Sequence, residues 1–375
     1  MQENYLGASI PKLGFGLMRL PQLADGSIDI EQVKTMVDAF MEAGFTYFDT
    51  AYVYGNGASE LAAKAALIDR YPRESYQLAT KLPAWEHTTP EDMRKMFETS
   101  MERTQAGYFD FYLMHNVNRN NIADFDRLNA WDYVQDLKKQ GLVKNAGFSF
   151  HDTADMLDEL LTKHPYVDFV QLQLNYIDWE SDSVQSRKCY EVARKHGKPV
   201  IVMEPVKGGA LAGLSEEIQA MYKAVNPNLS IPSWAVRFVA SLDGLVTVLS
   251  GMSSLEQMQD NLSYMKDFHP LNETERATIA KAVEILNNTP TVPCTACKYC
   301  VDDCPQKINI PDIFKALNGY RVYQNSAKET PRYQEATKDG GAAKDCLECG
   351  LCESHCPQHL EIRELLKEAS SIFDA

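Results

Sequence analysis

Short apolar runs alternate with longer segments of helical periodicity from Leu13 to about Leu249. Eight of these runs are rich in β-branched and aromatic residues, which is typical of buried strands. The expected strands are Leu13–Gly16, Thr46–Asp49, Tyr76–Lys81, Phe109–His115, Val143–Ser149, Val167–Leu172, Pro199–Met203 and Leu245–Ser250. The expected helices between them include Ile30–Ala43, Ser59–Ile68, Pro90–Thr104, Asp126–Gln140, Asp155–Lys163, Val184–His196 and Trp234–Ala240. This alternation predicts an α/β fold, the closed (β/α)8 TIM barrel.

An open, doubly wound parallel sheet is the alternative fold. Such a sheet normally carries a glycine-rich fingerprint after its first strand, at the start of a helix. Here Gly14 and Gly16 have no third glycine after them, and the chain continues into Pro21 rather than into a helix. The sequence therefore favours the barrel.

The distribution of cysteine marks a second domain. Of the nine cysteines, only Cys189 precedes residue 294, and the other eight lie between Cys294 and Cys356. A helix is expected over Asn272–Asn287, because Asn272 and Glu275 form a capping-box pattern, and a proline-containing linker follows it. We therefore predict a barrel domain over residues 1–287 and a small, mainly helical domain over residues 288–375.

The composition of the chain argues against several classes of function. The 375 residues carry a formal net charge of −15, whereas a nucleic-acid interface is basic, so nucleic-acid binding is not expected. No signal peptide is visible at the N-terminus, and no apolar run approaches the ~18–20 residues that a membrane span needs. We expect a cytoplasmic protein that does not bind membranes. In that compartment the cysteines stay reduced, so disulfides are not expected.

The eight C-terminal cysteines form two runs of the same spacing, C-x2-C-x2-C-x3-C-P. This spacing is that of bacterial 4Fe–4S sites, in which the fourth cysteine of each run binds the other cluster. One cluster is therefore expected on Cys294, Cys297, Cys300 and Cys356, and the other on Cys346, Cys349, Cys352 and Cys304. The pattern resembles two-cluster bacterial ferredoxins, with a longer insert between the halves. Structural zinc is the alternative, although it has no use for a third cysteine in each run. Cys189 is expected to be an ordinary buried residue.

Four residues with acid–base chemistry stand at or just after the ends of successive strands: Asp49, Tyr54, Lys81 and His115. Taken singly, each has a structural explanation, such as a turn cap or a solvated strand end. Together they lie where barrel enzymes carry out chemistry, at the carboxyl ends of the strands. A tyrosine is a poor acid at neutral pH unless a cation lies beside it. The set is therefore typical of proton donation to a carbonyl oxygen.

The segments around these residues resemble the aldo-keto reductase family. The match is carried by Gly44–Glu60, Ala79–Lys81 and Asp110–His115, and it extends over most of Pro11–Asn261. The resemblance implies a (β/α)8 barrel and nicotinamide-dependent interconversion of a small carbonyl compound and an alcohol. It also implies that Tyr54 is the general acid and that Lys81 lowers its pKa. Asp49 would then pair with Lys81, and His115 would position the substrate.

The resemblance also implies a set of cofactor contacts. Ser149 and Gln171 match residues that hydrogen-bond the nicotinamide amide, although Phe150 replaces the usual asparagine. One further segment matches the one that contacts the nicotinamide and pyrophosphate, and it contains Met203, Pro205, Lys207 and Gly209. Another matches the one that holds the adenosine end, and it contains Gly251, Gln257 and Asn261. NADP-preferring members often have Lys and Arg at the positions of Gly251 and Gln257, so the expected cofactor is NAD(P)H without a strict preference for the phosphorylated form. A flavin in or near the barrel mouth is a further candidate cofactor, because exchange between a hydride carrier and one-electron clusters normally needs one, although no flavin motif is visible.

These patterns favour an oxidoreductase in which an aldo-keto-reductase-like barrel is coupled to, or regulated by, two 4Fe–4S clusters. The expected partners are a small carbonyl or alcohol substrate and a flavoprotein or ferredoxin that exchanges electrons. Two alternatives remain: a non-catalytic redox sensor, and an electron-transfer subunit that uses the barrel for docking. The loops Trp85–Thr89, Asn116–Asp124 and Ile177–Ser183 are expected to shape the substrate pocket.

Overall fold

The computed structural model describes residues 5–84, 89–294, 296–302, 304–356, 358 and 360–374. Of the expected pocket loop Trp85–Thr89, residues 85–88 lie outside the described residues. Within the described part of the chain, no helix combines the length and apolar character that crossing a membrane requires.

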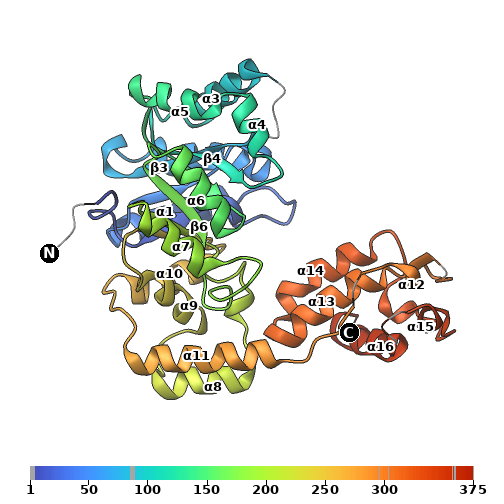
Figure 1. The fold of residues 1–375 in the computed structure, drawn as a ribbon. Helices are drawn as coiled ribbons and strands as arrows, with labels where there is room; N and C mark the ends of the chain where they lie inside the picture. The colour runs from blue at the N-terminus through green and yellow to red at the C-terminus, as the bar shows by residue number, and fades with distance from the viewer. Residues whose placement is uncertain are drawn as a thin grey trace. The chain divides into compact units, whose positions relative to one another are not determined.

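Eight parallel strands close into a barrel in the order β1 to β8, and β1 pairs with β8 (Figure 1). Consecutive strands are hydrogen-bonded neighbours all the way round, as the alternation of strands and helices predicted. The strands are β1 Leu13–Gly16, β2 Tyr47–Asp49, β3 Gln77–Leu82, β4 Phe109–Val117, β5 Val143–Phe150, β6 Phe169–Gln173, β7 Val200–Met203 and β8 Leu245–Ser250. The expectation of a (β/α)8 barrel is confirmed.

Helices on the outside of the barrel connect these strands, and α10 follows the last of them (Figure 1). They are α1 Ile30–Glu42, α2 Ala58–Ala63, α3 Pro90–Thr104, α4 Ile122–Arg127, α5 Ala130–Lys139, α6 Ala154–Lys163, α7 Ser186–Lys195, α9 Ile231–Ala240 and α10 Leu255–Met265. The helix expected over Asp126–Gln140 is in fact two, because Asn129 adopts a left-handed φ of 55° and starts α5 anew. The helix expected over Ser59–Ile68 continues α2 as a π-helical turn from Lys64 to Ile68.

Helix α3 shows why the bounds of many helices and strands could be predicted from nearby residues in the sequence. Thr89 accepts a hydrogen bond from the backbone N–H of Asp92, and the Asp92 side chain accepts one from the Thr89 N–H. This capping box, with Pro90 in the first turn, defines the start of the helix without help from the rest of the fold. At its end Gln105 takes a left-handed φ of 54°, which stops further helical hydrogen bonding.

Large apolar side chains fill the barrel interior, so it is a packed core and not a channel. The cluster contains Tyr47, Ala79, Phe111, Leu113, Phe169, Ile201, Val246 and Leu249. Leu6 and Ile10 pack against it from the segment that precedes β1. Chemistry in the barrel is thereby confined to the ends of the strands.

The chain forms two compact units, and the second of these contains the cysteine runs. The first unit comprises residues 1–206 and 233–272, and the second comprises residues 207–232 and 273–375. These units reflect contacts within the structure, and the domain boundary expected at residues 287/288 stays a prediction. The segment after β7 joins the second unit because its helix α8, Glu216–Val225, packs against α11, Glu273–Asn288 (Figure 1).

The remaining helices of the second unit are short and surround a core of their own. They are α12 Tyr299–Asp302, α13 Ile310–Tyr323, α14 Ser326–Thr337, α15 Leu351–Ser354 and α16 Ile362–Phe373. Ile310, Phe314 and Leu317 of α13 are buried in this core with Leu366 of α16 and Tyr333 of α14. This core brings the two cysteine runs together, although more than forty residues separate their first members along the chain.

Candidate functional site

Three adjacent strands and one loop position the acid–base set. Asp49 is the last residue of β2, Lys81 lies near the end of β3, and His115 lies near the end of β4. Tyr54 begins the short helical turn Tyr54–Gly57 after β2. Because the strands are parallel and adjacent, their carboxyl ends bring these side chains to one place.

Lys81 is the centre of this arrangement. Its side chain is 1% exposed, and its ammonium nitrogen donates to Asp49 Oδ1 at 2.5 Å and to the Thr50 carbonyl oxygen at 2.7 Å. The same nitrogen lies 4.8 Å from the centre of the Tyr54 ring. A buried ammonium is retained only where a carboxylate and further acceptors compensate for its lost hydration. Asp49 and Thr50 therefore hold a positive charge beside the Tyr54 phenol.

The pKa of Tyr54 lies above its ordinary value, although Lys81 acts on it in the predicted direction. Burial raises this pKa, and Lys81 lowers it by a smaller amount, so the net value lies above the ordinary one. Lys81 thus acts in the predicted direction, but the loss of hydration outweighs it. Since a phenol needs to be protonated to act as an acid, the raised pKa keeps Tyr54 in its proton-donating form.

His115 completes the set as a neutral imidazole. Its ring lies at 80° to that of Tyr54, with 5.8 Å between the ring centres. Burial lowers the pKa of His115 well below its ordinary value, and the nearby charges of Lys81 and His151 lower it further. A neutral imidazole beside an acidic phenol can hydrogen-bond a carbonyl oxygen without competing for its proton.

These two pKa shifts predict a broad plateau in the pH dependence of carbonyl reduction. We expect kcat/KM to stay level from about pH 6.5 to about pH 10, the ordinary pKa values of the two side chains. The lowered pKa of His115 moves imidazole protonation below this window, and the raised pKa of Tyr54 moves loss of the phenolic proton above it. A pH profile of kcat/KM tests this. An acidic limb near neutrality that disappears in His115→Gln would contradict it.

Two of the predicted nicotinamide contacts, Ser149 and Gln171, lie on the neighbouring strands β5 and β6. They pair in register and are 1% and 2% exposed, respectively. Ser149 Oγ accepts a hydrogen bond of 2.7 Å from the Asn116 N–H, so its own proton remains to be donated. Within the described residues, the buried Gln171 Oε1 has no hydrogen-bond partner. A buried amide oxygen of this kind is satisfied when a ligand donates to it, and a carboxamide can do so.

The segment after β7 carries four more of the predicted contacts. Met203 ends β7 and is partly exposed, and Pro205 follows it within the first compact unit. Lys207 and Gly209 belong to the second unit and have left-handed φ angles of 50° and 90°. The segment is therefore a sharply turned loop.

The predicted adenosine-end residues surround the start of α10. Gly251 has open space where a side chain would project, and Gln257 Oε1 accepts a hydrogen bond of 2.8 Å from the Ser253 N–H. Asn261 is buried and donates to Ser250 Oγ at 2.6 Å. In this structure Asn261 therefore ties α10 to the end of β8.

Glu204 and His151 are residues at this site that sequence reasoning missed. Glu204 follows β7 with a left-handed φ of 57°, and its charge raises the pKa of Tyr54. Its carboxylate lies 3.9 Å from the Arg19 guanidinium. His151 directly follows β5 and lowers the pKa of His115. Their positions in the sequence could have identified them as site residues, since each directly follows the end of a strand.

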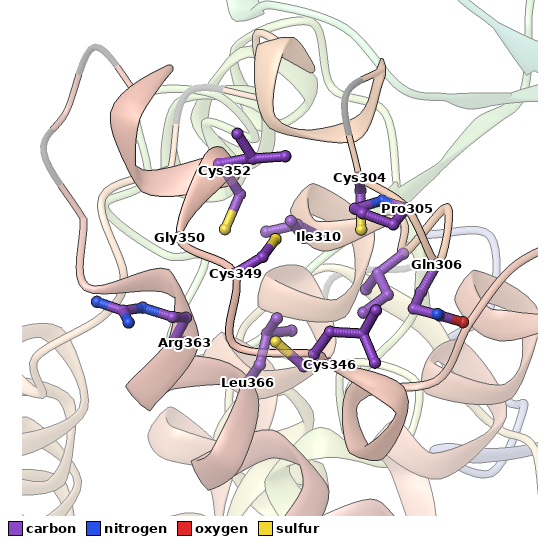
Figure 2. A pocket seen from close by; sticks show the side chains of 13 residues that line it. Cys304, Pro305, Gln306, Ile310, Cys346, Cys349, Gly350, Cys352, Arg363 and Leu366 are labelled. Atoms are coloured by element: carbon purple, nitrogen blue, oxygen red, sulfur yellow. The ribbon is translucent and has the colours of Figure 1, made fainter.

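Four cysteines from both runs surround one cavity in the second unit. Cys346, Cys349 and Cys352 of the second run line it together with Cys304, the last cysteine of the first run (Figure 2). The empty volume is about 350 Å³. Figure 2 shows the four sulfur atoms turned toward a common space, which Ile310 and Leu366 border.

A second cavity shows the reciprocal arrangement. Cys294, Cys297 and Cys300 line it with Cys356, and its empty volume is about 320 Å³. The cysteines surround these cavities rather than a single point: within the described residues, no three Cys, His, Asp or Glu side chains are grouped to hold a single metal ion. The exchange of the fourth cysteine matches the grouping that the spacing predicted.

The chemistry of the thiols suits a positively charged inorganic group. Burial raises the pKa of Cys300 and of Cys352 to about 11, so each would be protonated on its own at neutral pH. A coordinating metal supplies the positive charge that deprotonates a thiol outright. Cys189, by contrast, is 4% exposed at a distance along the chain from both runs, as expected of a structural residue.

Comparison with protein families divides the chain in two. Residues 12–284 match the aldo/keto reductase family, and residues 293–361 match the 4Fe-4S dicluster domain. The first match covers more than half of the chain. The second places an iron–sulfur domain at its C-terminal end.

Related proteins are oxidoreductases by name. The chain is 28% identical to the probable aldo-keto reductase 1 of Glycine max over 55% of this chain and 59% of that protein. It is 24% identical to the L-galactose dehydrogenase of Arabidopsis thaliana over 75% of this chain and 92% of the relative. It is 31% identical to the methylglyoxal reductase DkgA of Escherichia coli O157:H7 over 41% of this chain. The match spans about half the length of DkgA, 51%.

Solved structures show the same barrel. The aldo-keto reductase AKR11C1 from Bacillus halodurans, in its holo form, aligns with a TM-score of 0.59 and 23% identity, over 75% of this chain and 96% of that one. An aldo-keto reductase from Klebsiella pneumoniae in complex with NADPH aligns with a TM-score of 0.60 and 21% identity, over 72% of this chain and 90% of that one. At these identities the likeness concerns the fold.

Proposed function

Since the chain belongs to the aldo/keto reductase family, we propose that it interconverts a small carbonyl compound and its alcohol with a nicotinamide cofactor. The buried Lys81 ammonium, held by Asp49 beside the Tyr54 ring, is the observation that carries this proposal. The presence of a desolvated cation beside a phenol argues against a barrel that has kept only a docking or sensing role.

The residues at the strand ends fit a nicotinamide. Gln171 offers a buried amide oxygen to a carboxamide N–H, and Ser149 offers a hydroxyl proton to the carboxamide oxygen. Met203, Gly209 and Asn261 are among the further residues that would hold the cofactor. When bound in its reduced form, the nicotinamide supplies a hydride.

The protein itself supplies the proton and the orientation. Tyr54 Oη gives its proton to the carbonyl oxygen as negative charge develops there, and the Lys81 ammonium stabilises the resulting phenolate. Asp49 keeps Lys81 charged and fixed in place. The neutral His115 imidazole donates a hydrogen bond that orients the carbonyl.

We further propose that the second unit holds two 4Fe–4S clusters. Cys294, Cys297, Cys300 and Cys356 would ligate one cluster, and Cys346, Cys349, Cys352 and Cys304 would ligate the other. The support is the match to a 4Fe-4S dicluster domain together with the two cavities, each lined by four cysteines.

The nicotinamide and the iron–sulfur clusters transfer electrons in different numbers. A nicotinamide transfers a hydride, which is two electrons at once, whereas a cluster passes single electrons. We propose that the clusters serve an external one-electron partner of the flavoprotein or ferredoxin class. A flavin bound to the protein is the alternative link between the two kinds of transfer.

Binding and turnover of the anaerobically purified, full-length protein test this function. We expect NADH and NADPH to bind with similar affinity, because Gly251 and Gln257 supply no cation for the 2′-phosphate. A panel of small aldehydes and ketones should show substrate-dependent oxidation of the bound nucleotide. Failure of both nucleotides to bind at millimolar concentration would refute the assignment.

A further inference from the structure

The loop Lys207–Gly209, after β7, has an unusual backbone. Lys207, Gly208 and Gly209 have φ angles of 50°, 59° and 90°, so three successive residues are left-handed. This conformation is sterically unfavourable for lysine, which carries a Cβ. Strained backbone of this kind persists where neighbouring groups hold it in place.

The start of helix α14 holds this loop. Lys328 Nζ donates to the Gly208 carbonyl oxygen at 2.7 Å and to the Lys207 carbonyl oxygen at 3.4 Å. Asn325 Nδ2 donates to the Gly209 carbonyl oxygen at 3.2 Å. The loop and α14 belong to the same compact unit, so three consecutive carbonyls of the loop are engaged within that unit.

Asn325 is itself fixed by two further contacts. It is the N-cap of α14, and its Oδ1 accepts a hydrogen bond of 3.1 Å from the Lys328 N–H. It also packs against Gly213, where an added Cβ would come within 2.9 Å of Asn325 Cγ. The cap therefore holds the Asn325 side chain in place and links it to Lys328, whose backbone N–H it binds.

The position of these contacts has an electrostatic consequence. In a trans peptide the carbonyl and the N–H point to opposite sides. The Lys207 and Gly208 carbonyls point at Lys328, so the N–H groups of Gly208 and Gly209 point away from it. Two N–H groups on one side of a turn, with an ammonium behind them, favour a bound anion.

We propose that Asn325 and Lys328 are positioning residues for the Lys207–Gly209 loop and thereby strengthen binding of the nicotinamide cofactor's pyrophosphate. This inference rests on the proposed function, in which Lys207 and Gly209 contact the cofactor. Both positioning residues lie in the insert between the two cysteine runs, where compact two-cluster ferredoxins have a shorter connection. The insert thus gives the iron–sulfur domain a role in cofactor affinity that requires no electron transfer.

Titration of the full-length, cluster-containing protein with NADH and with NADPH tests the proposal. Asn325→Ala and Lys328→Met should each weaken binding by roughly tenfold, the effect of losing one or two hydrogen bonds to the loop. Lys328→Arg should retain most of the affinity, because a cation still reaches the carbonyls. Lys338→Met is the matched control, since Lys338 follows the same helix and pairs only with Glu335 among the ion pairs of the described residues.

Two further measurements separate positioning from general damage. In Asn325→Ala and Lys328→Met, the iron content and the kcat at saturating nucleotide should match those of the wild type, whereas the KM for the nucleotide should rise. Amide hydrogen exchange over residues 207–213 should accelerate in Asn325→Ala and Lys328→Met. Unchanged affinity or unchanged exchange in these variants would overturn the proposal. If the wild type itself binds neither nucleotide, the proposed function fails, and this inference is refuted with it.

Discussion

Replacing Tyr54 by phenylalanine should lower kcat for carbonyl reduction by roughly 10²–10⁴-fold, the range associated with loss of a general acid. The hydroxyl is the only group removed, and the phenyl ring still fills the space beside Lys81 and His115. Affinity for the nicotinamide should change little, because the predicted cofactor contacts lie on other residues. Steady-state kinetics and a nucleotide titration on the same preparation measure both quantities.

Tyr52→Phe is a suitable control for this experiment. Tyr52 lies two residues earlier, and its ring packs under the Arg103 guanidinium at 4.3 Å. Its hydroxyl has no role in the proposed chemistry, so the rate should stay within about twofold of the wild type, as for a change away from a catalytic contact. Near-full activity of Tyr54→Phe would remove Tyr54 from the mechanism.

Removal of three cysteines at a time should reveal how the clusters are wired. In one variant Cys346, Cys349 and Cys304 become serine, which removes three cysteines from a single cavity. We expect this protein to lose one cluster, retain half of its iron and sulfide, and keep the electron paramagnetic resonance signal of the other cluster unchanged. The reason is that the remaining cavity keeps all four of its thiols.

A second triple variant serves as the matched control and differs from the first at one position. It replaces Cys346 and Cys349 as before, but replaces Cys356 instead of Cys304. This protein should lose one cluster, and the signal of its second cluster should also change, because Cys356 lines the other cavity. Iron and sulfide analysis and resonance spectra of the reduced proteins distinguish the two. The reverse result, with the second cluster disturbed only in the Cys304 variant, would show that each run ligates its own cluster.

Local signals in the sequence were sufficient for the barrel. The alternation of strand and helix predicted all eight strands to within a few residues, since each strand is a short apolar run bounded by polar residues. The acid–base set was also predictable, because strand ends can be located from sequence and parallel strands bring their ends together. Its contacts with a ligand remain predictions.

Other features depended on contacts between distant residues. The repeated cysteine spacing predicted the grouping of thiols, but only the folded core shows Cys304 beside Cys346 and Cys356 beside Cys294. The predicted effect of Lys81 on the pKa of Tyr54 had the correct sign but was too small to decide the net shift. Burial decides that shift, and burial depends on the packing of the whole barrel end.

The sequence by itself thus determined the order of the strands, the acid–base residues at their ends and the cysteine pattern, because each is encoded in residues close together in the chain. Only the tertiary structure assigned the Lys207–Gly209 loop to the unit that carries the cysteines. Lys328 and the Gly208 carbonyl are 120 residues apart, and neither residue carries a local signal of the other. Their contact exists because α14 packs in a core built from several distant segments, and no periodicity in the sequence reports such a core.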